Sequence, residues 1–329
     1  MKMMVYCYRD FDEAEALKIC EKELGVECET SPAYPTLNDF RALRGRGFDI
    51  VSVNPTDLGR PYIELLHEAG VRYIATRSIG YDHIDLAAAR EFGIRVCNCG
   101  YPPTGVADYT IMLMLMCCRR IKHIFQRSAV QDYSLRGKLG RDIAHSTVGI
   151  IGTGSIGSTV AKRLRGFGCR IIASSPQVNA ELTDFVEYVS LDELCRRADI
   201  ITLHARSNAE TRHMIGREQF AIMRPDALLI NTARGDLVDT EALVEAIETE
   251  QIAGAALDVI ENEFGLYYLN LMGQPLKDRT LAALESFPNV IITPHTAFYT
   301  DVNTVEMMRT STEGCLLAEK GEKSVYQVV

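Results

Sequence analysis

The sequence predicts an α/β protein whose parallel sheets are wound on both faces by helices, arranged as two domains. Short apolar runs alternate with segments in which apolar residues recur every three to four positions, a pattern typical of strands followed by packed helices. A glycine-rich turn joins one such strand to one such helix at 152–157. The length of 329 residues is that of about two domains.

The glycine-rich turn lies within TVGIIGTGSIGSTVAKRLRGF at 147–167. Gly152 permits a tight turn, Gly154 lets the backbone approach a pyrophosphate, and Gly157 lets helix and strand pack closely. The phosphates would then meet the helix N-terminus. We interpret the stretch as a Rossmann-like dinucleotide site in preference to a plain structural turn, because strand, glycines and helix follow one another in the required register.

The end of the following strand, at 170–173, bears on the choice of cofactor. An acidic residue at this place usually accepts hydrogen bonds from the ribose hydroxyls of NAD. Here the strand runs into Ser174, Ser175 and Pro176, so no carboxylate would repel a 2′-phosphate. No arginine follows directly to bind that phosphate either. These residues are compatible with NAD or with NADP.

The composition of the chain narrows the kinds of molecule that the protein binds and the cell compartment in which we expect it. The net charge is −9 and the pI is near 5.4, which argues against nucleic acid or an anionic membrane surface as the main partner. The N-terminal apolar run is too short for a signal peptide, and the apolar run at 109–118 is too short to span a membrane. We therefore expect a cytoplasmic protein that acts on small molecules.

The cysteines and histidines form no recognisable metal site. Ten cysteines in a chain of this size are interpreted as reduced, mostly buried thiols. The CNC at 97–99 and the CC at 117–118 lack the paired spacing of a zinc site, and the seven histidines do not cluster. We predict no metal.

The first hundred residues repeat a strand-then-helix pattern, which a Tyr-Pro-Pro break at 101–103 ends as a linker would. The RSIGY stretch at 77–81 follows a strand, and its backbone amides form either an anion-binding concavity or a simple tight turn. The expected strands are 2–7, 50–53, 71–75 and 94–97, and the expected helices are 13–24, 61–69 and 85–92.

The rest of the chain continues the alternation. A long helix is expected at 104–127, then a polar loop at 132–146, and later a helix that Ser190 opens with the spacing of a capping box. Parallel strands place their carboxyl ends at one sheet edge, where ligands gather. The further expected elements are strands at 200–203, 227–231, 253–259 and 290–292, and a helix at 241–249.

Polar residues directly after these strands form a candidate reaction centre. They are His204, 232–234, 258–263 and 293–295. A ketone that accepts hydride needs a proton at its oxygen, which a histidine can donate. A carboxylate would hold the histidine in one tautomer, and an arginine can pair with a substrate carboxylate. Taken singly, each has a structural explanation: His295 as a loop histidine, Arg234 as a cap, and Glu261 or Glu263 as solvated carboxylates.

The motifs resemble those of the D-isomer-specific 2-hydroxyacid dehydrogenase family over nearly the whole length. The similar segments are GTGSIG at 152–157, NTARGDLVDTEAL at 231–243, AALDVIENE at 255–263 and TPHTAFYT at 293–300. Within the family, RSIGYDHID at 77–85 and VADYTIMLMLM at 106–116 resemble the D-lactate dehydrogenases of the glycopeptide-resistance type.

This resemblance implies a fold of two Rossmann-like or flavodoxin-like domains with the active site in the interdomain cleft. It implies a discontinuous substrate-binding domain of residues 1–100 and 300–329, and a NAD(P)-binding domain of residues 101–299. It also implies a homodimer whose interface contains the helix after the first hinge, which would account for the apolar run at 109–118.

The resemblance also implies roles for single residues. Arg234 would bind and polarise the 2-oxo acid, His295 would be the acid/base, and Glu263 would orient it. Asp258 would lie beside the nicotinamide. With the strand-end residues Ser174, His204 and Arg206, the predicted cofactor contacts are Gly152, Gly154, Ser155, Ile156, Gly157, Ser175, Ala205, Thr211, Thr232 and Ala233. The predicted substrate contacts are Ser78, Ile79, Gly80, Tyr101, Phe298 and Tyr299.

Three departures from the family pattern bear on function. Ser175 replaces the aspartate of NAD-preferring relatives, Arg206 replaces a proline and could assist a 2′-phosphate, and Tyr-Pro-Pro-Thr at 101–104 replaces the commoner start of the hinge. The expected reaction is NAD(P)H-dependent reduction of pyruvate or a similar small 2-oxo acid to the D-2-hydroxy acid. The alternatives are a bulkier branched or aromatic 2-oxo acid, and a cofactor-sensing regulator without enzymatic activity.

Overall fold

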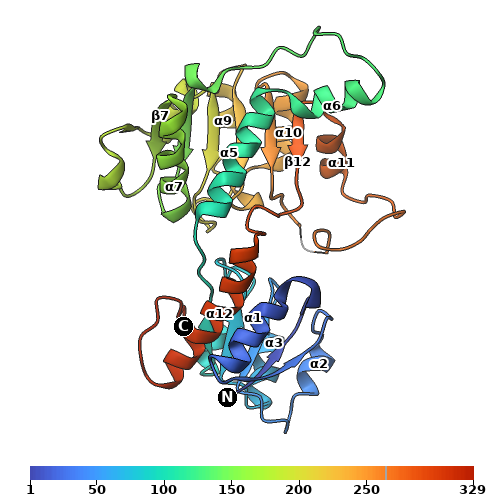
Figure 1. Cartoon of the computed structure of the whole chain (residues 1–329), viewed down its shortest axis with the longest axis vertical. Coiled ribbons are helices and arrows are strands. Elements are labelled where there is room, and N and C mark those ends of the chain that lie inside the picture. Colours follow the sequence, from blue (N-terminus) through green and yellow to red (C-terminus); the bar gives the residue numbers. More distant parts are fainter. Residues whose placement is uncertain (264) are drawn as a thin grey trace. The chain divides into compact units, whose positions relative to one another are not determined.

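The computed structural model describes residues 1–263 and 265–329. It contains two compact units (Figure 1). Unit 1 comprises Met1–Pro102 and Tyr299–Val329, and unit 2 comprises Pro103–Phe298. Each unit has its own parallel sheet and its own hydrophobic cores.

Unit 1 is built on a five-stranded parallel sheet with the strand order β2-β1-β3-β4-β5. Apolar residues from α2, α3 and α4 cover one face, and apolar residues from α1 and α12 cover the other. The strands are β1 Lys2–Val5, β2 Glu27–Thr30, β3 Ile50–Val53, β4 Tyr73–Thr76 and β5 Arg95–Cys97. The helices are α1 Asp10–Lys22, α2 Leu37–Arg41, α3 Arg60–Glu68, α4 Leu86–Glu91 and α12 Asp301–Glu319.

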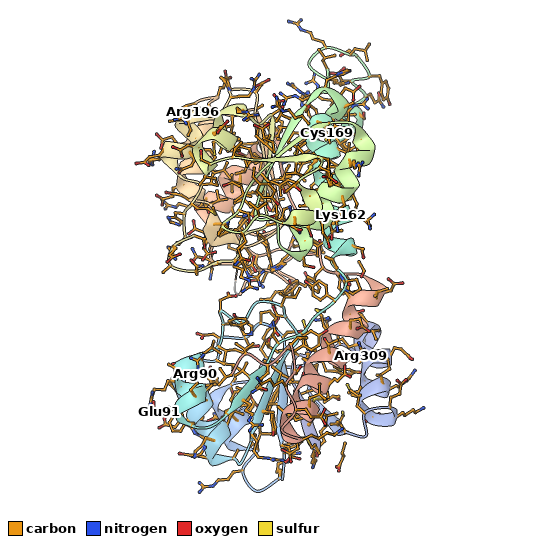
Figure 2. The ribbon with its side chains drawn as sticks, turned by 90° about the vertical axis from the view of Figure 1, so that its left-hand side faces the viewer. Arg90, Glu91, Lys162, Cys169, Arg196 and Arg309 are labelled. Carbon is orange, nitrogen blue, oxygen red and sulfur yellow. The ribbon has the colours of Figure 1, made fainter. Side chains whose placement is uncertain are left out.

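The C-terminal helix α12 belongs to unit 1 because its apolar side completes the core under β4 and β5. Met308 and Cys315 are fully buried there, against Ala16 and Cys20 of α1, which runs beside α12 (Figure 1). On the partly exposed side, Arg309, which is labelled in Figure 2, forms ion pairs with Glu306 and Glu313 of the same helix.

Unit 2 is built on a seven-stranded parallel sheet with the strand order β12-β11-β10-β9-β6-β7-β8. Apolar residues of α5 and α7 cover one face, and those of α8, α9, α10 and α11 cover the other. The strands are β6 Thr147–Ile151, β7 Arg170–Ser174, β8 Val186–Tyr188, β9 Ile200–Leu203, β10 Leu228–Asn231, β11 Gly254–Leu257 and β12 Val290–Ile292.

The helices of unit 2 either precede β6 or fall between the strands, where they form the crossovers that parallel strands require. They are α5 Thr104–Cys118, α6 Ile121–Ala129, α7 Ser155–Leu164, α8 Leu191–Arg197, α9 Arg217–Ile222, α10 Thr240–Glu248 and α11 Arg279–Ser286, with short 3₁₀ turns η1 Ile143–His145, η2 Arg165–Phe167, η3 Ala180–Leu182 and η4 Gly235–Leu237. The prediction of doubly wound parallel sheets is therefore confirmed for both units.

The predicted long helix at 104–127 is wrong, because the structure has two helices there. α5 ends at Cys118, and Arg120 has a left-handed backbone with φ of 53°. The chain that returns at 140–141 closes the end of α5: the Arg141 amide donates to the Cys118 carbonyl at 2.7 Å. The break lets α5 stay in the core while α6 leaves it.

The apolar run at 109–118 is partly buried within unit 2. Ile111, Leu113, Met114 and the two cysteines of α5 pack against the sheet, whereas Met112 of the same run is 40% exposed. Across residues 1–263 and 265–329, no helix combines the length and the apolar character that crossing a membrane demands.

Candidate active site

The glycine turn at the end of β6 has the geometry of a dinucleotide-binding turn. Gly152 adopts φ of +91°, which favours glycine, and its amide donates to the Ser174 carbonyl at 2.8 Å. A Cβ on Gly157 would lie 2.0 Å from the Gly152 carbonyl oxygen, so helix and turn touch through their backbones. The turn thus holds the start of α7 against the end of β6.

The same turn leaves room for a phosphate. A Cβ on Gly154 would meet nothing within 4 Å, so the backbone is open on that side. Gly154 is also the N-cap of α7, and no side chain caps the first amides of that helix. Free first-turn amides and the helix dipole attract an anion. Ser155, Ile156 and Gly157, which form that first turn, therefore fit the pyrophosphate of NAD or NADP.

The end of β7 presents hydroxyl groups beside the glycine turn. The Ser175 hydroxyl accepts from the Thr153 amide at 3.4 Å, and the Thr153 hydroxyl accepts from Tyr188 at 3.1 Å. Ser174 is the last residue of β7. The nearest carboxylate along the chain, Glu181, pairs with Lys162 at 2.6 Å. The surface that follows β7 is therefore neutral.

His204 follows β9, and its backbone packs against the glycine turn at Gly152. Its backbone amide donates to the Ile151 carbonyl at 2.7 Å, and its Nε2 lies 3.0 Å from the Thr202 hydroxyl. Burial lowers the pKa of His204 to about 3, so its ring is neutral near pH 7. Burial therefore disfavours His204 as the proton donor of a reaction at that pH.

The loop after His204 is closed by hydrogen bonds within itself. The Thr211 hydroxyl donates to the Arg206 carbonyl at 2.7 Å and accepts from the Asn208 amide at 2.9 Å. Ala205 is partly buried, whereas Arg206 is exposed. These hydrogen bonds therefore fix the backbone from which the exposed Arg206 side chain extends.

The turn after β10 carries Arg234. The Thr232 hydroxyl is 2.8 Å from the Thr110 hydroxyl on α5. The side-chain amide of Asn231 donates to the Arg234 carbonyl at 2.8 Å. The Ala233 amide donates to the Asn231 side chain at 3.0 Å. These bonds fix the backbone on both sides of the partly buried Arg234, whose own Nη1 donates to the Ala233 carbonyl at 2.8 Å.

Asp258, after β11, holds the loop that carries His295. The carboxylate is fully buried and accepts from the Thr293 hydroxyl at 2.6 Å, the Thr296 amide at 2.9 Å and the Ala297 amide at 2.8 Å. The Asp258 carbonyl also accepts from the His295 amide at 2.7 Å. A buried carboxylate with this many donors is well compensated, so Asp258 anchors the histidine loop.

His295 and Glu263 form a histidine–carboxylate pair. His295 Nδ1 lies 2.6 Å from Glu263 Oε1, and each side chain is 20% exposed. Glu263 Oε2 is buried and has no hydrogen-bond partner among the described residues, so His295 is the group that compensates this carboxylate. With Nδ1 bound to Glu263, the imidazole presents Nε2 as its reactive nitrogen.

Tyr268 is a residue at this site that the sequence did not identify. Its hydroxyl donates to the His295 carbonyl at 2.9 Å, and its ring centroid lies 6.1 Å from that of His295. Phe298 adds a third ring, at 5.9 Å from His295 and 6.4 Å from Tyr268. Tyr268 lies in an irregular segment without periodicity or a motif, so no signal in the sequence could have found it.

The other predicted substrate residues belong to unit 1. Ser78, Ile79 and Gly80 follow β4, and the Ile79 carbonyl accepts from the Asn98 side chain at 2.8 Å. Just before them, Arg77 is buried and pairs with the equally buried Glu13 at 3.0 Å. The last two, Tyr101 and Tyr299, flank the unit boundaries.

The Tyr299 side chain forms a hydrogen bond within unit 1. Its hydroxyl donates to Asp12 Oδ2 at 2.6 Å, which attaches the residue after Phe298 to α1. Tyr101 is partly buried and lies one residue before the last residue of the first segment of unit 1.

In unit 2 the predicted residues share one edge of one sheet. The order of the strands along that edge is β12, β11, β10, β9, β6 and β7. Following the same order, the edge carries His295, Asp258 with Glu263, Thr232 to Arg234, His204 to Arg206, the glycine turn, and Ser174 with Ser175.

A cation-binding group of three or more His, Cys, Asp or Glu side chains is not found within the described ranges.

Residues 111–297 match the family model described as "D-isomer specific 2-hydroxyacid dehydrogenase, NAD binding domain". The D-specific alpha-keto acid dehydrogenase of Enterococcus faecium is 40% identical and covers 95% of both chains. The aromatic 2-oxoacid reductase of Clostridium sporogenes is also 40% identical, over 92% of this chain and 91% of that one. The solved structure of a D-lactate dehydrogenase from Sporolactobacillus is similar, with a TM-score of 0.83, 35% identity, and coverage of 100% of this chain and 99% of that one.

Proposed function

Since this chain belongs to the D-isomer-specific 2-hydroxyacid dehydrogenase family, we propose that it reduces pyruvate or a similarly small 2-oxo acid to the D-2-hydroxy acid with NADH or NADPH. The observation that carries the proposal is the His295–Glu263 pair, which shares a sheet edge with Arg234 and with the glycine turn. A proton donor, an arginine for a carboxylate and a dinucleotide turn together meet the needs of this reaction.

In the proposed mechanism, the reduced nicotinamide, when bound, supplies the hydride that adds to C2 of the 2-oxo acid. His295 gives the proton on Nε2 to the carbonyl oxygen, so the ketone becomes an alcohol and the imidazole becomes neutral. Glu263 holds the opposite nitrogen and stabilises the protonated ring before the transfer. Arg234 pairs with the substrate carboxylate and polarises the adjacent carbonyl. The contact of the Ser78–Gly80 amides with substrate, which the family resemblance implies, stays a prediction.

The substrate is tested by following the absorbance of NADH and of NADPH with pyruvate, 2-oxobutyrate, 2-oxoisocaproate and phenylpyruvate. Rapid oxidation with the two small acids is the expected result. Oxidation only with the two bulkier acids would keep the mechanism and change the substrate. No oxidation with any of them would contradict the enzymatic proposal and favour a cofactor-sensing regulator.

A bulkier substrate is the second candidate, and the aromatic cluster at His295 favours it. Tyr268 and Phe298 place two rings about the imidazole that would protonate the substrate. Rings at such a place can pack against the side chain of a branched or aromatic 2-oxo acid. The aromatic 2-oxoacid reductase of Clostridium sporogenes, at 40% identity, has a substrate of this kind in its name.

For the cofactor, we propose that NADPH is accepted at least as well as NADH, because the surface after β7 carries Ser174 and Ser175 in place of a carboxylate. Ser175→Asp is expected to lower kcat/KM for NADPH by about tenfold, since a carboxylate would repel the 2′-phosphate. The values for NADH should change little. Ser175→Asn is the matched neutral control, and an unchanged NADPH/NADH ratio in Ser175→Asp would contradict the assignment.

The proposed homodimer is supported by large apolar side chains that are exposed in and after α6. None of the nine described residues of α6 is fully buried, and Phe125, Tyr133, Leu135 and Leu139 are between 66% and 87% exposed. Exposed apolar side chains of this size are covered when they lie in an interface. We expect light scattering to give twice the mass of the chain, and Leu135→Glu with Leu139→Glu to give the monomer mass. Val178→Glu, an exposed position elsewhere, serves as the control. A wild-type monomer at micromolar concentration would refute the dimer.

A cytoplasmic location is part of the same proposal. All ten cysteines are free thiols, which suits a reducing compartment.

A further inference from the structure

A second histidine–carboxylate pair lies close in sequence to the first. His213 Nε2 is 2.7 Å from Glu261 Oε1, and the two side chains are 36% and 19% exposed. Glu261 precedes Glu263 by two residues, on the segment that follows β11. The exposed Arg212 is more distant from Glu261, at 3.7 Å, so His213 is its main partner on that oxygen.

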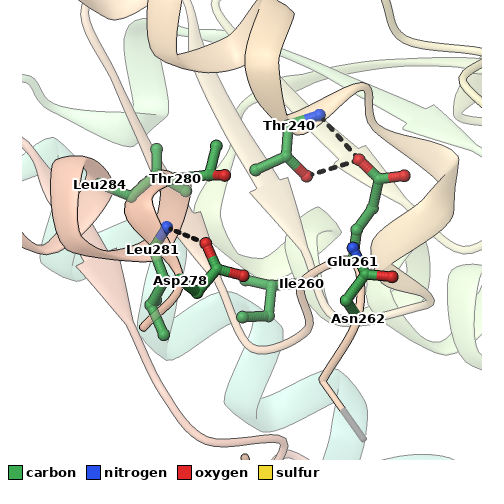
Figure 3. A pocket seen from close by; sticks show the side chains of 8 residues that line it. All are labelled: Thr240, Ile260, Glu261, Asn262, Asp278, Thr280, Leu281 and Leu284. Atoms are coloured by element: carbon green, nitrogen blue, oxygen red, sulfur yellow. Dashed lines mark hydrogen bonds between the residues drawn. The ribbon is translucent and has the colours of Figure 1, made fainter. Parts of the chain in front are cut away.

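The other oxygen of Glu261 binds the start of α10. Oε2 accepts from the Thr240 amide at 3.1 Å and from the Thr240 hydroxyl at 2.8 Å (Figure 3). Thr240 is the first residue of α10, where a carboxylate interacts favourably with the helix dipole. Burial raises the pKa of Glu261, but the hydrogen bonds from His213 and Thr240 outweigh it and leave that pKa below its usual value. The side chain therefore stays ionised and joins α10 to the segment that carries Glu263.

His213 is attached to the turn that follows Arg234. Its amide donates to the Asp236 carbonyl at 2.7 Å, and the Ile215 amide donates to the Leu237 carbonyl at 3.1 Å. The segment 213–215 thus lies alongside the turn 235–238. His213 consequently contacts the arginine turn through its backbone and the glutamate segment through its side chain.

The two catalytic segments also touch directly. A Cβ on Gly235 would lie 2.0 Å from the carbonyl carbon and oxygen of Ile260. Backbone packed this closely transmits a displacement, because neither side has space to absorb it. A shift of the segment around Glu261 would therefore move Arg234 as well as Glu263.

We propose that His213 and Glu261 act as a positioning pair, which sets the alignment of Arg234 and Glu263 for the reduction of the 2-oxo acid. The inference rests on the proposed function, because it assigns the pair an effect on that reaction. Neither residue touches the reacting atoms. Their effect passes through the turn at 234–238 and the segment at 260–263.

The kinetic test compares Glu261→Ala, His213→Ala and the double variant with wild type. In Glu261→Ala we expect the KM for the 2-oxo acid to rise about tenfold, through Arg234, and kcat to fall about tenfold, through Glu263. The double variant should lose no more than about twofold beyond Glu261→Ala, because the first substitution already breaks the pair. The Kd for NADH should stay within about twofold of wild type, since the glycine turn follows β6 and is separate from the pair.

A conservative variant separates positioning from simple loss of stability. The amide of Glu261→Gln can still accept from Thr240, so it should recover most of the activity lost in Glu261→Ala. Glu241→Gln, an exposed glutamate on the same α10, is the matched control and should behave as wild type. If Glu261→Ala lowers only the Tm and keeps both kinetic constants at the level of the Glu241→Gln control, the pair is structural and the proposal is overturned.

Hydrogen exchange distinguishes failure of this inference from failure of the proposed function. In Glu261→Ala, amides in 232–238 and 258–263 should exchange faster, while those in 148–157 should not change. This readout needs no substrate, so it applies even if the wild type reduces none of the four 2-oxo acids. Unchanged exchange in both segments would overturn the positioning role whatever the activity.

Discussion

Replacing His295 by alanine is expected to lower kcat for reduction of a 2-oxo acid by roughly 10²–10⁴-fold, the usual contribution of a general acid. The donated proton has to come from a group held at the carbonyl, and His295 is held on two sides. Glu263 binds its Nδ1 at 2.6 Å, and Asp258 accepts from its amide at 2.7 Å. Steady-state kinetics with saturating NADH, together with NADH binding measured by fluorescence, checks this expectation.

The controls for His295→Ala test whether the loss belongs to this histidine and to this pair. His145→Ala removes an exposed histidine of unit 2 and should leave kcat unchanged. In Glu263→Gln the fall of the reduction rate with increasing pH should begin at lower pH, because an amide stabilises the imidazolium less than a carboxylate does. Turnover of His295→Ala within a few-fold of wild type would rule out the assignment, and an unmoved pH profile in Glu263→Gln would count against the pairing.

Arg234→Gln is expected to lower kcat/KM for the 2-oxo acid by roughly 10²–10³-fold, because a paired carboxylate would lose its charged, bidentate partner. The backbone around Arg234 is held by Asn231, so the loss should come from the side chain and leave the fold intact. Part of the loss should appear in KM, since the arginine binds the substrate, and part in kcat, since it polarises the carbonyl.

Two further variants make the arginine test specific. Arg234→Lys keeps the positive charge without the planar pair of donors, and it should recover only part of the activity. Arg196→Gln, at an exposed position on α8 (Figure 2), should behave as wild type. Full activity of Arg234→Gln would mean that another group binds the substrate carboxylate.

Several elements of the fold follow from local pattern alone. The strands at 50–53, 200–203 and 290–292 have the predicted bounds, because short apolar runs enclosed by polar residues are unambiguous in a parallel sheet. β2 and β8 escaped prediction because they lie at the edges of their sheets, where β2 is partly exposed and β8 spans only three residues. The break between α5 and α6 was not predicted from the sequence. The hydrogen bond that closes the end of α5 comes from the Arg141 amide, more than twenty positions away in the chain.

The candidate site likewise contains residues that the sequence identifies and residues that it does not. Residues directly after strands could be collected from the sequence, since all the strands of a parallel sheet end at one edge. Their roles in catalysis and binding stay predictions. Glu261 had no distinguishing signal beside Glu263, and its partner His213 lies in a turn 48 residues earlier. The hydroxyl of Tyr268, which reaches the His295 carbonyl, was likewise beyond any pattern in the chain.

The sequence by itself determined the alternation of strands and helices, the glycine turn and the chemistry available at the strand ends, because these depend on residues near one another in the chain. The family motifs already implied that Glu263 orients His295, whereas tertiary structure alone decided that Glu261 binds His213. It also decided that Asp258 anchors the histidine loop and that His204 is neutral. Such pairings depend on distances and burial that arise only when segments remote in sequence pack together.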